Sequence, residues 1–356
     1  MPTPDSPPSA RPRRRRLVVD LAATSRNWAL PEWGRRVVAE AAPRGWEACL
    51  VAAPTVSDGD GGRAASDEAL ALVGGAEAYF GFGFNRALLA AAPGLRWVHS
   101  AAAGVGSLLF PELVDSDVVL TNSAGVMAVP IAEHVVGGVI YLLRSFDVAV
   151  DLQRRGTWDK APFVGEGSRM RELGDCRALV VGAGGIGSAV ATRLAAFGTV
   201  CTGIRRRPEL GVPAGFARVA GPTALDDELA SADIVVLAAP ATPSTERLLT
   251  RERLSRLPKD AIVVNVGRGA LLDAEALVDA LNAGRLRGAV LDVFDREPLD
   301  ADSPLWRMPQ VLLTPHVSAV SPSRFWERAL ALFAENWRRY DAGMTMRNVV
   351  DKRAGY

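Results

Sequence analysis

Short apolar runs alternate with amphipathic stretches along most of this chain. Between residues 17 and 121 the amphipathic stretches, such as 32–42 and 87–92, have the spacing of helices. The apolar runs between them predict buried strands at 17–19, 50–52, 78–81, 95–98 and 118–120. Because strands that alternate with helices form parallel sheets covered on both faces, this part of the chain predicts an α/β domain.

The second part of the chain repeats this alternation after a long apolar helix pattern at 128–144. Its runs are rich in Val, Ile and Leu, as is typical of strands covered on both faces. They predict strands at 179–181, 200–204, 233–237, 261–265, 289–292 and 311–314. A last helix, at 323–340, follows these strands, and we expect it to return to the first domain.

The chain begins with a Pro- and Ser-rich segment that ends in a basic run at 11–16. We expect residues 1–16 to be a disordered basic tail rather than a binding arm. A secretion signal is a poor fit, because the apolar stretch after the arginines is short and contains Asp20.

The remaining composition excludes several classes of protein. A net charge of +1 favours neither nucleic acid nor an anionic membrane, and no apolar run is long enough to span a bilayer. The cysteines lack CxxC or metal-ligand spacing, so we expect no metal site and a cytoplasmic protein. They are Cys49, Cys176 and Cys201.

A glycine-rich turn follows the run at 179–181 and leads into a small-residue helix. Gly182 permits the tight turn, Gly184 lets the backbone approach a pyrophosphate, and Gly187 allows close packing of helix on strand. Gly185 and Ile186 begin the helix, whose amide groups and dipole attract phosphates. The pattern predicts that a nicotinamide dinucleotide binds here.

The next strand of this unit ends in three arginines, of which Arg205 and Arg206 come first. Enzymes that use NAD usually carry an acid at this point, bonded to the ribose 2′-hydroxyl. An acid would repel a 2′-phosphate, whereas guanidinium groups pair with it. The sequence therefore favours NADP over NAD, although a solvated basic loop has the same composition.

Polar side chains follow three later strands, at the edge where ligands of parallel α/β sheets bind. Arg268 follows the run at 261–265, Glu297 comes shortly after the run at 289–292, and His316 follows the run at 311–314. A histidine can transfer the proton, a carboxylate can hold its other ring nitrogen, and an arginine can bind a substrate carboxylate. Together the three predict reduction of a 2-oxo acid.

These motifs, in this order, resemble the D-isomer-specific 2-hydroxyacid dehydrogenases, and particularly their glyoxylate/hydroxypyruvate reductase branch. The resemblance covers nearly all of the chain after the basic tail. Its motifs lie at 97–105, 121–125, 131–134, 155–158, 182–187, 265–269, 291–294, 297–299 and 314–316.

The resemblance implies roles for individual residues. Arg268 binds and polarises the substrate, Glu297 orients His316, and His316 is the acid–base group. The loop at Ala102, Ala103 and Gly104 receives the substrate carboxylate on its backbone amides. The cofactor contacts that it implies, besides the glycine-rich turn and His316, are Pro240, Thr245, Val266, Asp292 and Ser318.

We therefore expect two Rossmann-like, doubly wound domains. A flavodoxin-like substrate-binding domain comprises residues 17–124 and 320–356, and a dinucleotide-binding domain comprises 125–319. The expected activity is hydride transfer between NADPH, or NADH, and a small 2-oxo or 2-hydroxy acid. The resemblance also implies a homodimer, with the helix at 128–144 as one subunit contact unless it is an ordinary core helix.

Two other functions fit the same fold. One is an NAD(P)-binding transcriptional regulator, and the other is a dehydrogenase for another small anion such as phosphite. Fold alone does not separate them from a 2-oxo acid reductase.

Overall fold

The computed structural model describes residues 14–54, 65–322 and 324–355. The chain divides into two compact units, Met1–Val126 with Pro322–Tyr356, and Met127–Ser321. The first unit is discontinuous because the last helix returns to it. Its boundaries lie within two residues of the expected 124 and 320.

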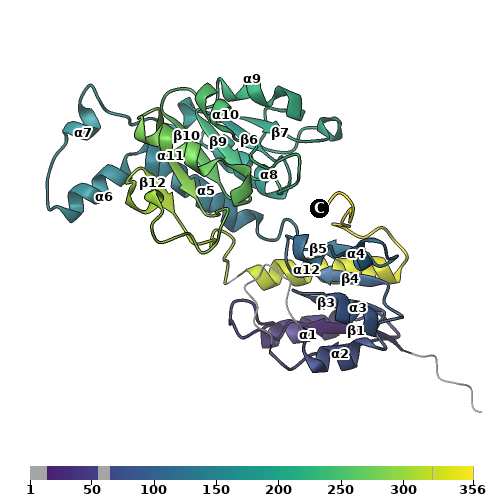
Figure 1. Cartoon of the computed structure of the whole chain (residues 1–356). Helices are drawn as coiled ribbons and strands as arrows, with labels where there is room; N and C mark the ends of the chain where they lie inside the picture. Colours follow the sequence, from purple (N-terminus) through teal and green to yellow (C-terminus); the bar gives the residue numbers. More distant parts are fainter. Residues whose placement is uncertain (1–13, 55–64, 323, 356) are drawn as a thin grey trace, which may run out of the picture. The chain divides into compact units, whose positions relative to one another are not determined.

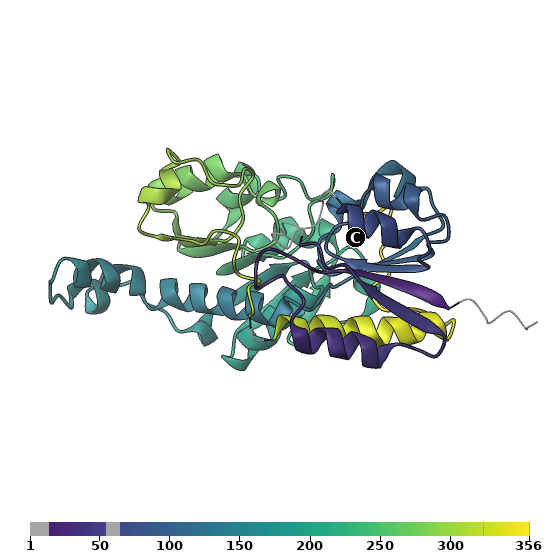
Figure 2. The same ribbon diagram turned by 90° about the horizontal axis from the view of Figure 1, so that it is seen from below.

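The first unit is a parallel five-stranded sheet with the strand order β2-β1-β3-β4-β5, which is the flavodoxin-like order. Helices α1 and α12 pack side by side on this unit (Figures 1 and 2). Its elements are β1 (Arg15–Asp20), α1 (Glu32–Ala41), β2 (Trp46–Leu50), α2 (Asp67–Val73), β3 (Ala78–Gly81), α3 (Arg86–Ala91), β4 (Trp97–Ser100), η1 (Gly106–Leu108), α4 (Pro111–Val114), β5 (Val119–Asn122) and α12 (Phe325–Asp341).

The second unit begins with three helices and continues into a seven-stranded parallel sheet. Its N-terminal part contains α5 (Ala128–Leu143), α6 (Phe146–Arg154), α7 (Ala161–Val164), η2 (Leu173–Asp175), β6 (Arg177–Val181), α8 (Gly185–Ala196), β7 (Val200–Ile204), η3 (Pro208–Leu210) and β8 (Arg218–Ala220). The rest contains η4 (Pro222–Ala224), α9 (Leu225–Leu229), β9 (Ile234–Leu237), α10 (Arg251–Arg256), β10 (Ala261–Asn265), η5 (Gly269–Leu271), α11 (Ala274–Asn282), β11 (Leu286–Leu291), η6 (Pro304–Arg307) and β12 (Val311–Leu313).

The strand order of this sheet is β12-β11-β10-β9-β6-β7-β8. The order reverses between β6 and β9, which pair with Val181 opposite Leu237. In doubly wound sheets ligands bind beyond the carboxyl ends of the strands at such a reversal. The two expected parallel-sheet α/β domains are thus confirmed, and β6 and β9 locate the binding edge of the second.

Helix α5 packs closely on strand β11. A β-carbon at Gly138 would lie 2.7 Å from Val290 Cγ1, and one at Gly288 would lie 3.0 Å from Leu142 Cδ2. Glycines therefore bring helix and strand together at two levels. Nine of the sixteen residues of this helix are buried in its own unit, so one face of it belongs to the core.

Some expected elements differ from the structure. The edge strand β2 lies at Trp46–Leu50 instead of 50–52, because these five residues are the ones that pair with residues 15–19 of β1. After Leu50 the amides of Ala52 and Ala53 turn to the Glu68 carboxylate. The three-residue edge strand β8 was not predicted, since its few residues give little periodicity.

The expected disordered tail ends too late. Residues 1–13 lie outside the described part of the chain, but Arg15 and Arg16 belong to β1, where they pair with Trp46 and Glu47. The basic pattern hid these strand residues, because their side chains are charged although their backbone is paired. Within the described ranges, no helix is both long and apolar enough to cross a membrane.

Candidate active site

The glycine-rich turn joins β6 to α8 with the geometry that a dinucleotide requires. Gly182 has φ +105°, and a β-carbon there would lie 2.6 Å from the carbonyl oxygen of Ala238. A β-carbon at Gly187 would meet the Gly182 carbonyl oxygen. These two glycines let the strand end, the helix and the β9 loop approach one another.

Gly184 has a different role, because a β-carbon there would meet nothing within 4 Å. It is the N-cap of α8 and caps no amide with a side chain. The first amides of the helix are those of Gly185, Ile186 and Gly187. No helical turn precedes them, so no helix carbonyl accepts their protons. Open space beside unpaired amides at a helix N-terminus fits a pyrophosphate.

Arg205 follows β7 directly beside this turn. The Gly182 amide donates to the Ile204 carbonyl (2.8 Å). Arg205 is the residue after Ile204, so the arginines begin next to the first glycine of the turn. Arg205 NH1 reaches the Gly211 carbonyl at 3.4 Å, and Arg206 beside it is exposed. No carboxylate ends this strand, and the residues present fit a dinucleotide with a 2′-phosphate.

The loop after β9 carries Pro240 and Thr245. Thr245 Oγ1 donates to the Pro240 carbonyl (2.7 Å), which closes this loop on itself. A β-carbon at Gly267 would lie 2.8 Å from the Ala239 carbonyl oxygen, so the next loop packs against it. Val266, which begins that next loop, is buried.

Arg268 lies in this next loop, after β10, and its backbone is fixed by Asn265. The Asn265 side-chain amide donates to the Arg268 carbonyl (2.9 Å), and its Oδ1 accepts the Gly267 amide (3.2 Å). The Arg268 side chain is exposed, and NH1 donates to the Gly267 carbonyl (2.7 Å). Its guanidinium thus stands at the carboxyl edge without a carboxylate partner among the described residues.

Glycine 269 brings the arginine loop against the loop that carries Glu297. A β-carbon on Gly269 would overlap the backbone of Phe294 and Asp295. Glu297 Oε1 accepts the Phe294 amide (2.9 Å), and Glu297 Oε2 lies 2.8 Å from His316 Nδ1. The structure therefore places the three residues on adjacent loops after β10, β11 and β12.

His316 has a backbone that histidine adopts rarely, with φ +53°. A non-glycine residue in this region costs about 1–3 kcal/mol, and such residues cluster at functional sites. The His316 amide bonds the carbonyl oxygens of Asp292 (2.9 Å) and Thr314 (3.0 Å), which hold this conformation. The side chain is 28% exposed and can exchange protons with solvent.

The other two histidines have different surroundings. His99 is buried among aromatic rings, its Nδ1 is 2.7 Å from Thr121 Oγ1, and burial lowers its pKa to about 3. It is a neutral core residue. His134 lies in α5, with Nε2 3.3 Å from Thr314 Oγ1.

Asp292 is fully buried, and both of its carboxylate oxygens accept bonds from its own unit. Oδ1 accepts from Thr314 Oγ1 (2.6 Å) and the Val317 amide (2.9 Å), and Oδ2 accepts the Ser318 amide (3.0 Å). Thr314, His134 and the side-chain role of Asn265 were not predicted. A polar residue ending an apolar strand was the available signal for Asn265.

The loop at Ala102, Ala103 and Gly104 follows β4 in the first unit. Its carbonyl groups are engaged, since Ala102 accepts the Ser123 amide (3.0 Å) and Ala103 accepts Asn122 Nδ2 (2.7 Å). The Ala102 amide, which the resemblance also assigned to the substrate, already donates to Ser100 Oγ (3.2 Å). The amides of Ala103 and Gly104 have no acceptor among the residues that the structure describes. Two amides without acceptors are suited to bind an anion.

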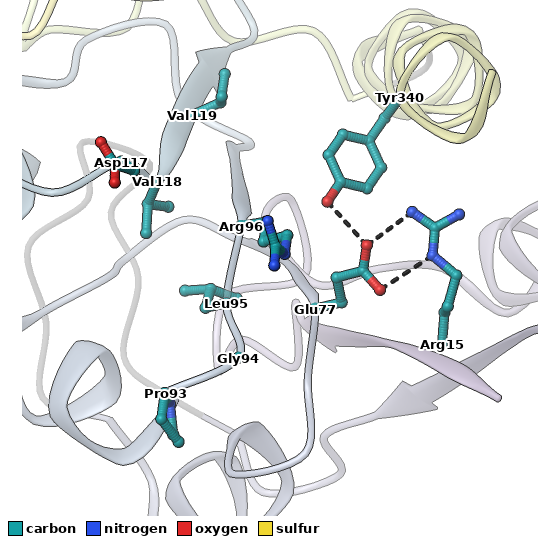
Figure 3. A pocket seen from close by; sticks show the side chains of 10 residues that line it. All are labelled: Arg15, Glu77, Pro93, Gly94, Leu95, Arg96, Asp117, Val118, Val119 and Tyr340. Atoms are coloured by element: carbon teal, nitrogen blue, oxygen red, sulfur yellow. Dashed lines mark hydrogen bonds and ion pairs between the residues drawn. The ribbon is translucent and has the colours of Figure 1, made fainter. Parts of the chain in front are cut away.

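A hollow of about 660 Å³ in the first unit contains none of the predicted site residues (Figure 3). Its lining includes Arg15, Glu77, Arg96, Asp117 and Tyr340. Glu77 and Arg96 directly precede β3 and β4, so the hollow lies at the amino ends of the strands. The predicted site residues lie at carboxyl ends, where α/β sheets bind ligands.

The fold and this site define a nicotinamide-dependent oxidoreductase. Residues 136–318 match the model of the D-isomer specific 2-hydroxyacid dehydrogenase NAD-binding domain. The chain is 32% identical to glyoxylate/hydroxypyruvate reductase A of Escherichia fergusonii over 270 residues, which are 74% of this chain and 82% of that protein. The chain therefore belongs to the D-isomer specific 2-hydroxyacid dehydrogenase family, and this prediction is confirmed.

Two solved structures are similar along nearly the whole chain. One is a D-isomer specific 2-hydroxyacid dehydrogenase from Xanthobacter autotrophicus Py2 in complex with NADPH and MES, with 31% identity, a TM-score of 0.77, and coverage of 96% of this chain and 99% of that one. The other is an NADPH-dependent glyoxylate/hydroxypyruvate reductase from Sinorhizobium meliloti in complex with NADP and sulfate. It has 27% identity, a TM-score of 0.74, and coverage of 96% and 100%.

Proposed function

We propose that this protein is an NADPH-dependent reductase of small 2-oxo acids such as glyoxylate or hydroxypyruvate. The observation that carries the proposal is the 2.8 Å contact between Glu297 Oε2 and His316 Nδ1, on loops next to that of Arg268. The similarity to two glyoxylate/hydroxypyruvate reductases supports this choice of substrate.

His316 is the proposed proton donor. Glu297 occupies Nδ1, so the proton is transferred at Nε2 to the carbonyl oxygen of the substrate. A carboxylate at Nδ1 fixes the tautomer and the orientation of the ring. The reduced dinucleotide, when bound, supplies the hydride to the carbonyl carbon. In the oxidation direction His316 takes the proton back from the hydroxyl group.

Arg268 is the proposed substrate-binding cation. Its guanidinium can form two parallel hydrogen bonds with a carboxylate and polarise the neighbouring carbonyl group. In the first unit, we assign the substrate carboxylate to the amides of Ala103 and Gly104, which have no acceptor in the described chain.

NADP is the proposed cofactor. Its pyrophosphate is assigned to the α8 N-terminus and its 2′-phosphate to Arg205 and Arg206. The remaining contacts, from Pro240, Thr245, Val266, Asp292 and Ser318, rest on the family resemblance. For Asp292 the structure shows a different engagement, because its carboxylate oxygens already bond the 314–318 loop.

A homodimer and a cytoplasmic location complete the proposal. We assign the subunit contact to α6, α7 and the segment between them, together with the face of α5 that is not buried in its own unit. Trp158 and Val164 of this segment are 91% and 78% exposed, and Figure 1 shows α6 and α7 extending from the sheet of their unit. Light scattering of the wild type and of Trp158→Ser tests this contact, and a monomeric wild type contradicts it.

The deciding experiment is oxidation of NADPH and of NADH with glyoxylate, hydroxypyruvate and larger 2-oxo acids, including a phosphorylated one. Turnover that prefers NADPH and the two small acids supports the proposal. Turnover that prefers NADH contradicts the assignment of Arg205. Cofactor binding without turnover of any acid favours the regulator. Reduction of NADP or NAD by phosphite, measured in a separate assay with the oxidised cofactor, favours the third function if no acid is turned over.

A further inference from the structure

His134 takes no part in the proposed reaction, yet it lies directly behind the loop that carries His316. Its Nε2 is 3.3 Å from Thr314 Oγ1, and the same oxygen is 2.6 Å from Asp292 Oδ1. Three side chains from α5, the β12 loop and the end of β11 thus form a continuous chain of hydrogen bonds. All of them belong to the second unit.

The packing of α5 on β11 brings His134 to this place. The contacts of Leu142 with Gly288 and of Gly138 with Val290 show that helix and strand run in opposite directions. Residues four apart share a helix face, and residues two apart share a strand face. One step further along both elements, His134 comes to the level of Asp292.

Asp292 holds the histidine loop on both sides of His316. Its carbonyl oxygen accepts the His316 amide (2.9 Å), and its carboxylate accepts the amides of Val317 and Ser318 (2.9 and 3.0 Å). Since His316 has φ +53°, the loop depends on these bonds to keep that conformation.

The direction of the hydrogen bonds in this chain can be assigned. Thr314 has one hydroxyl proton and donates it to Asp292 Oδ1 (2.6 Å). Its oxygen can then only accept from His134, so the His134 proton lies on Nε2. His134 in turn fixes the Thr314 hydroxyl on the carboxylate.

We propose that His134, acting through Thr314 and Asp292, is a positioning residue that fixes the His316 loop for proton transfer. The role of that loop rests on the proposed function. Loss of these hydrogen bonds lets the His316 imidazole shift from the position that its loop and Glu297 give it, and small shifts of reacting groups lower turnover strongly. Binding of the cofactor at the glycine-rich turn does not depend on the hydrogen bonds among His134, Thr314 and Asp292.

Two matched pairs of variants test this role by kinetics. Thr314→Val removes the hydroxyl group at constant shape, while Thr314→Ser keeps it. His134→Leu removes the donor, while His134→Gln keeps an N–H near the position of Nε2. We expect kcat to fall about 10-fold or more in Thr314→Val and His134→Leu, with a smaller change in the KM for NADPH. In Thr314→Ser and His134→Gln we expect kcat to stay within about twofold of the wild type.

The outcomes separate positioning from packing. Equal losses within each pair overturn the proposal, because shape rather than hydrogen bonding then matters. Wild-type kcat in all four variants overturns it as well.

A second readout does not need turnover. The chain has three histidines, so nitrogen NMR of the rings resolves few signals, and His134→Gln assigns one of them. We expect the wild-type His134 ring to carry a proton on Nε2, with a signal that changes in Thr314→Val and not in Thr314→Ser. A ring without that proton overturns the proposal, whatever the kcat values of the variants. If no 2-oxo acid is turned over, the proposed function fails while this result still decides the hydrogen-bond chain.

Discussion

Two clusters of charged side chains, one in each unit, are arranged in opposite ways. In the first unit Arg15 donates to Glu77 (2.7 and 3.0 Å) and to Asp341 (2.5 Å), and its guanidinium lies 4.2 Å from the Trp46 ring centroid. In the second unit Arg268 donates to the carbonyl of its neighbour Gly267. The first set, Arg15, Trp46, Glu77, Tyr340 and Asp341, is called the clamp cluster below.

The clamp cluster satisfies its own charges. Asp341 also accepts Trp46 Nε1 (2.7 Å), and Glu77 accepts the Tyr340 hydroxyl (3.0 Å; Figure 3). The Arg15 hydrogen bond lowers the pKa of Glu77, while burial and then Glu77 raise the pKa of Tyr340 to about 12. These bonds attach the end of α12 to β1, β2 and the start of β3.

The difference between the clusters teaches how to separate structural from functional charge in this protein. A guanidinium whose nitrogens all meet carboxylates holds the fold together, whereas one left without a carboxylate is available to a ligand. His316 adds a left-handed backbone, which the fold must stabilise. Substitutions in the clamp should therefore change stability, and those at the site should change turnover.

The largest expected effect is at the site. His316→Asn removes the proton donor and keeps a residue that tolerates the left-handed backbone. We expect kcat to fall about a thousand-fold, as for loss of a general acid, with the melting temperature and NADPH affinity retained. Steady-state kinetics, NADPH fluorescence titration and thermal denaturation check this, and a kcat within tenfold of the wild type contradicts it.

The clamp gives the next effect. Arg15→Ala leaves Glu77 and Asp341 without their cation, and we expect the free energy of unfolding to fall by about 2 kcal/mol. Turnover below the melting temperature should not change. Urea denaturation measures the loss, with the exposed neighbour Arg14→Ala as the matched control. A loss of activity at full stability would refute the separation of roles.

Arg205→Ala should act on cofactor choice alone. Loss of the guanidinium at the 2′-phosphate should raise the KM for NADPH about 10-fold, equivalent to about 1.4 kcal/mol. The KM for NADH should stay within about twofold and serves as the internal control. An unchanged KM for NADPH removes the 2′-phosphate assignment.

The smallest expected effect is on the free energy of unfolding at acid pH. Because the folded-state pKa of Glu77 is lowered, its pairing stabilises the protein above the ordinary value of 4.5, and this contribution is lost as pH falls through the lowered pKa. Wild type should exceed Glu77→Gln in stability at neutral pH by about 1 kcal/mol, with a gap that narrows below pH 4.5. Urea denaturation across this range measures the gap, and a constant gap contradicts the ionic role.

Periodic segments could be read from the sequence because burial on both faces leaves an apolar run. The strands β3, β7 and β10 lie where those runs are, and the glycine-rich turn follows β6 as expected. The edge strand β2 could not be placed so well, since one side of its pattern is polar and its register depends on β1. Arg15 and Arg16 were assigned to the tail because their charged side chains continue the basic run, although their backbone is paired in β1.

The amino-acid sequence by itself determined the class of fold and the place of the dinucleotide turn. It also predicted Arg268, Glu297 and His316 as site residues, because each follows a strongly apolar strand. Only the tertiary structure decided that β10, β11 and β12 are neighbours, which brings Glu297 to His316. It also decided that Asp292 and His134 meet at Thr314. Contacts between residues more than a hundred positions apart depend on helix–strand packing, and no local pattern in the sequence records that register.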